Sequence, residues 1–126
     1  MVPCSLIWCD QDKQHFERIS QSAELGNKFI NEVKFDHCHD LEAAHELINS
    51  SAKAVLIVSG QLGSLLLPQL QGGLKPVPNV TGVIVFCSNI EIHRSWAKNF
   101  SLVKMVTDDI NQVLACSNQL IQASCC

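Results

Sequence analysis

The sequence predicts an α/β fold in which helices cover both faces of a five-stranded parallel sheet. Five short apolar segments recur along the 126 residues, and between them the apolar residues change to the spacing of a helix. Three of these segments, Leu6–Cys9, Ala54–Val58 and Val83–Cys87, are apolar throughout. Strands buried on both faces have this pattern, whereas strands with one exposed face alternate. A parallel sheet is therefore expected.

Each strand candidate is an apolar run bounded by polar or turn residues. The predicted strands are Ser5–Cys9, Glu32–Phe35, Ala54–Val58, Gly82–Cys87 and Leu102–Val106. Helical faces are expected between and after them, since apolar residues recur there three or four positions apart. These faces comprise Phe16, Ile19, Ala23, Gly26 and Ile30; Leu41, Ala44 and Ile48; Ile92, Trp96 and Ala97; and Ile110, Val113, Leu114, Leu120 and Ile121.

The helix after the third strand is predicted to be short. Pro68 lies within it, and proline fits a helix comfortably only in the first turn. Residues 71–78 follow as a loop rich in glycine and proline. This loop is expected to separate two halves of one sheet and not two domains.

Alternating strands and helices with right-handed crossovers predict a three-layer sandwich with the flavodoxin-like strand order 2-1-3-4-5. Residues 1–126 are expected to form this single domain. Ligands of such sheets bind outside the carboxyl ends of strands 1, 3 and 4. The functional residues should therefore be sought at that edge.

Composition excludes several classes of protein. The chain is 47% hydrophobic and 17% charged, which is typical of a folded domain. Its net charge is −3 and its basic residues are scattered, so nucleic acid is not expected as a partner. No apolar run is long enough to span a bilayer and the amino terminus does not resemble a signal peptide. A cytoplasmic protein with no transmembrane segment is predicted.

Cysteine usage fits that compartment. The seven cysteines are odd in number, and several lie in strand-like runs where cysteine acts as a small hydrophobic residue. Reduced thiols are expected. Cys9 and Cys87 are interpreted as packing residues, because no histidine is placed beside them to act as a base.

Polar side chains follow several of the predicted strands. Asp10 and Asp12 come after strand 1, Ser59 ends strand 3, and Ser88 follows strand 4. The two aspartates fit either a cation site or a turn with a helix N-cap. Asp108, after strand 5, adds to the acidic character of this edge.

The segment Ser59-Gly60-Gln61-Leu62-Gly63-Ser64 has two interpretations. Its glycines could let the backbone approach an anion at a helix N-terminus, as in phosphate or nucleotide sites. Alternatively it is a tight turn in which Ser64 caps a short helix. It matches neither a dinucleotide-binding fingerprint nor a P-loop.

The acidic pair and the βα order over the whole chain resemble the receiver domains of two-component response regulators. In that family adjacent carboxylates hold magnesium beside a phospho-accepting aspartate at the end of strand 3. Asp10, Asp12 and the hydroxyl of Ser88 match the pattern, but Ser59 occupies the acceptor position and cannot form an acyl phosphate. The lysine after strand 5 is also missing, since Lys104 lies within the strand. The resemblance implies a pseudo-receiver.

A second resemblance rests on the sequences of four segments: residues 55–63, 83–87, 96–98 and 103–104. These segments are similar to a receiver-like domain that precedes arginine-specific ADP-ribosyltransferase or tetratricopeptide segments in some invertebrate proteins, notably those of rotifers. The resemblance implies an accessory domain, and 126 residues leave no room for the transferase itself.

Two further features are open to more than one interpretation. His37 and His39 would point the same way on an extended segment and are weak candidates for a zinc or copper site, although a loop with Asp40 as a helix N-cap needs no metal. The final Cys125-Cys126 resembles the geranylgeranylated ending of Rab-family GTPases, but acylation or an unmodified tail are alternatives, and an unmodified tail is favoured.

The predicted function is a non-catalytic pseudo-receiver module, without cofactor, that binds a protein partner or effector domain. By the receiver resemblance, its binding surface would be an exposed face formed by the predicted helix with Ile92, Trp96 and Ala97, the strand Leu102–Val106 and the helix that follows from Ile110. The alternative is a sensor of a small ligand or nucleotide that binds at the carboxyl edge. Its candidate ligand-binding residues are Asp10, Asp12, Ser59, Gly60, Gly63, Ser64 and Ser88.

Overall fold

The computed structural model describes residues 4–10, 33–71 and 79–125. Within them lie five strands, which form one sheet in which every neighbouring pair is parallel. The strands are β1 (Cys4–Cys9), β2 (Val33–Cys38), β3 (Lys53–Ser59), β4 (Val80–Phe86) and β5 (Val103–Thr107). Their order across the sheet is β2-β1-β3-β4-β5, so the predicted order 2-1-3-4-5 is confirmed.

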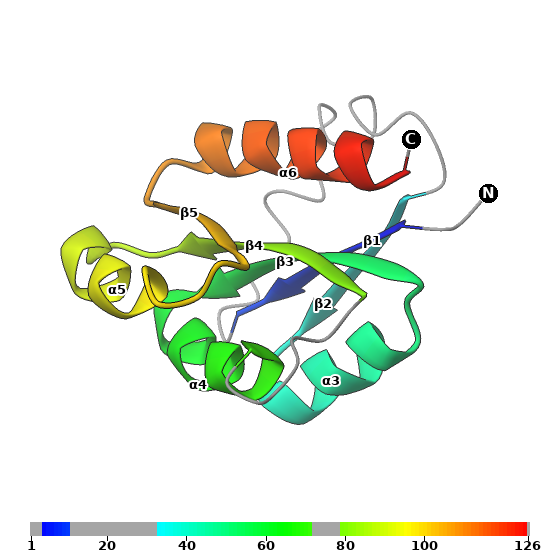
Figure 1. Ribbon diagram of the computed structural model, residues 1–126, viewed down its shortest axis with the longest axis horizontal. Helices are drawn as coiled ribbons and strands as arrows, with labels where there is room; N and C mark the ends of the chain where they lie inside the picture. Colours follow the sequence, from blue (N-terminus) through cyan, green and yellow to red (C-terminus); the bar gives the residue numbers. More distant parts are fainter. Residues whose placement is uncertain (1–3, 11–32, 72–78, 126) are drawn as a thin grey trace.

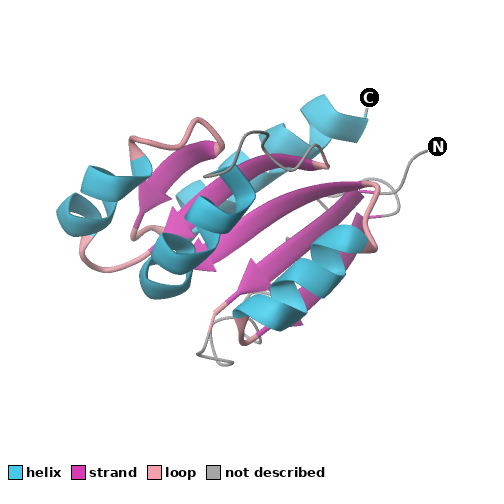
Figure 2. Ribbon diagram, turned by 60° about the horizontal axis from the view of Figure 1, so that its bottom comes forward, coloured by secondary structure: helices cyan, strands magenta, loops and turns pink. Residues whose placement is uncertain are grey.

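Four helices are described, and they lie on both faces of the sheet. α3 (Leu41–Asn49), α4 (Gly60–Gln71) and α5 (Ile90–Ala97) cover one face, whereas α6 (Ile110–Cys125) crosses the other (Figures 1 and 2). This arrangement is the predicted three-layer α/β sandwich of the flavodoxin-like type. The expected helical face between Phe16 and Ile30 lies outside the described residues.

The apolar strands are buried on both sides, as the absence of alternation predicted. In β3, Leu56 and Val58 belong to the core beneath α3 and α4, while Val55 and Ile57 belong to the core beneath α6. Successive side chains of a strand point to opposite faces, so a strand between two helical layers needs apolar residues at every position.

Strand β2 is longer than predicted, because it continues beyond Phe35 to Cys38. Its whole length pairs in register with β1, so Asp36 and His37 belong to the ladder in spite of their polarity. Backbone pairing with β1 outweighs the weak strand preference of these two residues. The predicted helix cap, Asp40, lies two residues after β2. Its carboxylate accepts a 2.8 Å hydrogen bond from the Ala43 N–H at the start of α3.

The prediction of a short third helix is wrong. α4 runs for 12 residues, from Gly60 to Gln71, with Pro68 inside it. Proline removes one helical hydrogen bond, but Pro68 lies in the last turn and on an exposed position, where water can reach the backbone. The helix therefore ends soon after the proline and not before it.

No helix among residues 4–10, 33–71 and 79–125 combines the length and the apolar character that crossing a membrane would need.

Candidate functional site

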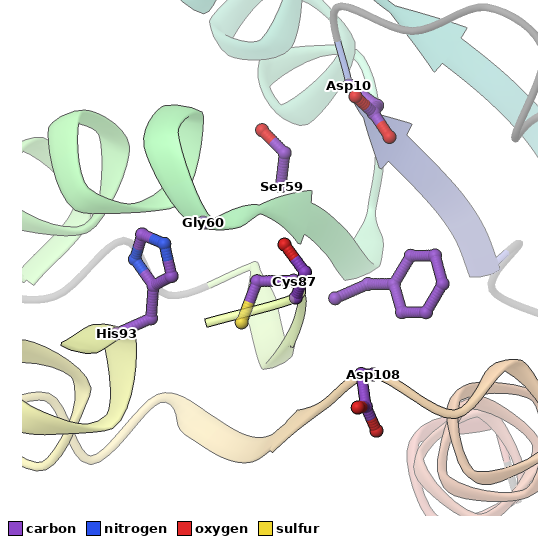
Figure 3. Close-up of a pocket in the computed structure, with 8 residues that line it drawn as sticks. Asp10, Ser59, Gly60, Cys87, His93 and Asp108 are labelled. Carbon is purple, nitrogen blue, oxygen red and sulfur yellow. The ribbon is translucent and has the colours of Figure 1, made fainter. Parts of the chain in front are cut away.

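A pocket of about 350 Å³ opens at the carboxyl ends of the strands. Its lining comes from the ends of β1, β3 and β4, the first residue of α4, the first turns of α5, and the residue after β5. The lining residues are Asp10, Ser59, Gly60, Phe86, Cys87, Ser88, His93 and Asp108. In Figure 3, Asp10 and His93 lie on opposite sides, with Ser59 and Cys87 between them. This position, where the chain changes direction across the sheet, is where such folds bind ligands.

The structure brings together Asp10, Ser59, Gly60 and Ser88 from the predicted set. The other described candidates, Gly63 and Ser64, lie within α4 and do not line the pocket. Asp12 lies outside the described residues. The predicted edge of the sheet therefore contains a pocket, although only part of the predicted residue set reaches it.

Strand β3 passes directly into α4 at Ser59. The Ser59 hydroxyl oxygen accepts a 3.2 Å hydrogen bond from the Leu62 N–H, which makes Ser59 the cap of the helix. Ser64, which was a candidate cap, instead donates its hydroxyl to the Gln61 carbonyl at 2.8 Å inside the helix. The tight-turn interpretation of this segment is wrong, because the helix begins one residue after the strand ends.

The two glycines of this segment allow α5 to approach α4. A Cβ atom on Gly60 would collide with the imidazole ring of His93 in α5, and one on Gly63 would lie 3.1 Å from Trp96 Cη2 in α5 and 2.8 Å from Val58 Cγ2 in β3. No glycine among the described residues has a positive φ, so neither glycine is required for a left-handed turn. Glycine at position 60 leaves space for the His93 ring at the pocket.

His93 is held in one orientation by the core. The Trp96 indole N–H donates to His93 Nδ1 at 3.0 Å, and the two rings meet edge to face. An indole N–H can only donate, so Nδ1 must be the unprotonated nitrogen and Nε2 carries the hydrogen of the neutral ring. His93 therefore offers its Nε2–H to the pocket as a hydrogen-bond donor.

Asp10 directly follows β1 at a buried position, with 8% of its surface exposed. Its backbone N–H donates to the Cys38 carbonyl at 3.1 Å, and its carbonyl accepts a 3.2 Å hydrogen bond from His37 Nε2. Both contacts come from β2, the neighbouring strand. They hold the backbone that presents the Asp10 carboxylate to the pocket.

The two candidate metal-binding histidines do lie together, with ring centroids 4.4 Å apart at an angle of 88°. His37 also bonds the Asp10 backbone, and His39 is exposed. Among the described residues, no three His, Cys, Asp or Glu side chains are grouped so that they could hold a metal ion.

Cys87 shares the pocket with His93, a neighbour that sequence reasoning did not place beside it. Burial raises the pKa of the Cys87 thiol, and the nearby Asp108 carboxylate raises it further, while Arg94 opposes them. The thiol is therefore protonated at neutral pH. A protonated thiol is a poor nucleophile, so Cys87 is better suited to packing and weak hydrogen bonding than to covalent catalysis.

Four lining residues were absent from the predicted set: Phe86, Cys87, His93 and Asp108. Asp108 belongs to the acidic edge that the sequence indicates after strand 5. His93 carried no such signal, because only the packing of α5 against Gly60 brings it to the pocket. Among the described residues no lysine lines the pocket, and Lys104 Nζ donates to the Ser101 carbonyl near the start of β5.

No protein-family model, curated protein or solved structure was found to match the chain.

Proposed function

We propose that the chain is a binding module that senses a small polar molecule in the pocket at the carboxyl edge of its sheet. The observation that carries this proposal is the pocket itself, which is about 350 Å³ in volume and combines Asp10, Ser59 and Ser88 with His93 and Asp108. Binding sites for small molecules have volumes of roughly 300–1,000 Å³ and a few convergent polar groups.

The charge of the lining favours a neutral or cationic ligand. Asp10 and Asp108 contribute carboxylates, whereas no lysine or arginine is among the described lining residues. Because its Nδ1 accepts the Trp96 hydrogen bond, the His93 ring is neutral in this arrangement. A free phosphate in the pocket would be repelled by two carboxylates without a compensating cation. This repulsion argues against an anion site at Ser59–Ser64 and in favour of a neutral or cationic ligand.

The hydrogen-bonding groups of the lining further limit the class of ligand that the pocket can bind. The carboxylates of Asp10 and Asp108 can only accept, while His93 Nε2–H can only donate in the neutral form that Trp96 imposes. The Ser59 hydroxyl accepts from Leu62 and can still donate its own hydrogen. Phe86 adds an apolar wall. A compact molecule with hydroxyl or amine groups beside an apolar face, such as a nucleoside or an amino sugar, matches this set.

The test is thermal unfolding of the reduced protein with a panel of nucleosides, nucleotides, amino sugars, polyamines, NAD and inorganic phosphate. A ligand at 100 times its Kd should stabilise the protein by about 2.7 kcal/mol. Stabilisation by a neutral or cationic compound supports the proposal. The proposal fails if no compound of the panel stabilises the protein, or if phosphate alone does.

Neighbouring aspartates provide a matched control. Asp108 lines the pocket, whereas Asp109 accepts a 2.9 Å hydrogen bond from the Asn111 N–H at the start of α6. Asp108→Asn should weaken binding of the stabilising compound about tenfold, and Asp109→Asn should leave it within twofold, since a hydrogen bond to a charged group contributes about 1.5–3 kcal/mol. Equal effects of the two substitutions would place the ligand elsewhere.

The second candidate is a non-catalytic pseudo-receiver that binds a protein partner or effector domain through α5, β5 and α6. Two observations favour it. Ile92 on α5 is 62% exposed, although it is a large apolar residue. β5 is also an edge strand of the sheet, so its outer backbone has no neighbouring described strand.

A substitution on α5 separates this candidate from the sensor. Ile92→Ser should change the free energy of unfolding by less than about 0.5 kcal/mol, because the side chain is exposed. It should reduce co-purification of any protein partner obtained with the wild type, while Leu65→Ser, a matched exposed leucine on α4, should not. Unchanged recovery of the partner with Ile92→Ser would remove this candidate.

A further inference from the structure

Cys9 and Cys38 lie side by side at the carboxyl ends of β1 and β2. They are direct partners across the parallel ladder, and their sulfur atoms are 2.9 Å apart. Both side chains are buried, with 1% and 2% of their surface exposed, and both belong to the core beneath α3 and α4. A covalent disulfide has a sulfur–sulfur distance of about 2.05 Å, so the two thiols lie within about 1 Å of bonding distance.

The backbone needs no rearrangement for this bond. Neighbouring strands lie about 4.8 Å apart, and disulfides join Cα atoms separated by about 4.4–6.8 Å. Residues paired in register on parallel strands point to the same face of the sheet. A small rotation of the two side chains is therefore sufficient.

We propose that Cys9 and Cys38 form a disulfide when the protein meets a low-molecular-weight disulfide such as oxidised glutathione. The bond would fasten the edge strand β2 to the central part of the sheet. The structure holds both residues as free thiols, which is the reduced form of the same site.

The reaction is a thiol–disulfide exchange in two steps. The Cys38 thiolate attacks one sulfur of the oxidant, which releases one glutathione thiolate and leaves a mixed disulfide on Cys38. Cys9 then loses its proton and attacks the Cys38 sulfur, which releases the second glutathione. The protein loses two electrons and two protons, and the oxidant is reduced to two glutathione thiols.

Cys38 is the better candidate for the attacking thiol. The hydrogen bond from Cys9 lowers the pKa of Cys38, whereas that bond and burial raise the pKa of Cys9. The oxidant can reach Cys38 because β2 lies at an edge of the sheet: among the described strands, β2 pairs only with β1. Opening of an edge strand disrupts one ladder, so it is among the less costly local motions of a sheet.

The disulfide would also affect a residue of the pocket, Asp10. Asp10 follows Cys9 directly, and its N–H donates to the Cys38 carbonyl at 3.1 Å. Oxidation would thus fix the backbone that carries one carboxylate of the pocket. This consequence rests on the proposed ligand site, whereas the disulfide itself requires no ligand.

The test uses the full chain with Cys4→Ser, because a tryptic peptide of residues 1–13 otherwise contains both Cys4 and Cys9. The reduced protein is incubated with oxidised glutathione, the remaining thiols are blocked with N-ethylmaleimide, and the digest is examined by mass spectrometry. Peptides 1–13 and 35–53 are expected as one species that dithiothreitol separates. Closing this loop should raise Tm by about 5–10 °C, and dithiothreitol should reverse the rise.

Matched variants distinguish this bond from other oxidation. Cys38→Ser should abolish the joined peptide and the rise in Tm, while Cys87→Ser and Cys116→Ser should retain both. If Cys38→Ser does not fold, the joined peptide and the Tm of oxidised and reduced Cys4→Ser protein are compared instead. Glutathione adducts without a joined peptide, or a joined peptide only in denaturant, would overturn the proposal whatever the outcome of the ligand panel.

Discussion

The indole N–H of Trp96 donates to Nδ1 of His93 at 3.0 Å and links the core beneath α3 and α4 to the pocket. Trp96 packs against the buried residues of that core, whereas His93 lines the pocket one turn earlier in α5. The hydrogen bond therefore connects two functions of the helix: one turn fills the core, and the preceding turn presents a donor to a ligand.

Trp96→Phe should release the His93 ring. The substitution keeps an aromatic ring in the core but removes the N–H, so we expect a loss of stability of about 1 kcal/mol from the hydrogen bond, together with the cost of the smaller ring. Nitrogen NMR of the imidazole should show mainly the Nε2–H tautomer in the wild type and a mixture in the variant. The signals of His45, which contacts Gln69 on another part of the surface, should not change.

Gly60→Ala should destabilise the protein through His93. The added methyl group would occupy the position of the imidazole ring, so we expect a cost of about 1–3 kcal/mol in denaturant unfolding. In a His93→Ala background the same change should be neutral or stabilising, because alanine is preferred to glycine in a helix. A double-mutant cycle without coupling between positions 60 and 93 would contradict this relationship.

Ser59→Ala should cost about 1 kcal/mol in the free energy of unfolding, because it removes the oxygen that caps α4. Ser64→Ala is the matched control in the same helix. Its hydroxyl bonds only the Gln61 carbonyl among the described residues, and alanine favours the helix, so the expected change is below about 0.5 kcal/mol. Ser59→Asp should retain most of the cap, since aspartate is also favoured at this position.

The reactivity of Cys87 should depend on the charges beside it. Asp108 raises the pKa of the thiol and Arg94 lowers it, so Asp108→Asn should speed the reaction of Cys87 with iodoacetamide at pH 8, and Arg94→Gln should slow it. Peptide mass spectrometry measures the rate at each cysteine separately. Cys116, whose pKa is raised by burial alone, should keep its rate in both variants.

The same thiol predicts the response of stability to alkaline pH. A pKa above the ordinary value of 9.0 means that the folded state holds the proton more tightly than the unfolded state. Its contribution is complete below pH 9.0 and is lost as the pH rises through the folded-state pKa. Cys87→Ser should therefore reduce the loss of stability above pH 9.0, measured by urea unfolding at pH 7 and pH 10. An unchanged slope would show that the thiol does not titrate differently on folding.

The parallel sheet could be predicted because the composition of each strand reflects whether one or both of its faces are buried. A run such as Ala54–Val58, apolar at every position, is stable only between two helical layers, and this requirement leads to the parallel sheet. The end of β2 could not be predicted in this way. Asp36 and His37 are polar, and their place in the ladder is decided by pairing with β1, a contact between residues far apart in the chain.

The candidate site, like the fold, could be predicted only in part from the sequence. Asp10, Ser59 and Ser88 follow strands, so the rule that parallel strands end at one edge places them together. His93 comes from a helix face, where periodicity indicates only which side is apolar. Its approach to Gly60 depends on the packing of α5 against α4, which a pattern within one segment does not encode.

The direct passage from Ser59 into Gly60 has a consequence for how this pocket could change in evolution. No connecting residue separates β3 from α4, and the cap and the space for His93 occupy the junction itself. An insertion here would shift both at once. The segments between β4 and α5 and between β5 and α6 do contain connecting residues, at 87–89 and 108–109. Related proteins with a different specificity should therefore vary in length after β4 or β5 and keep the junction at Ser59 constant.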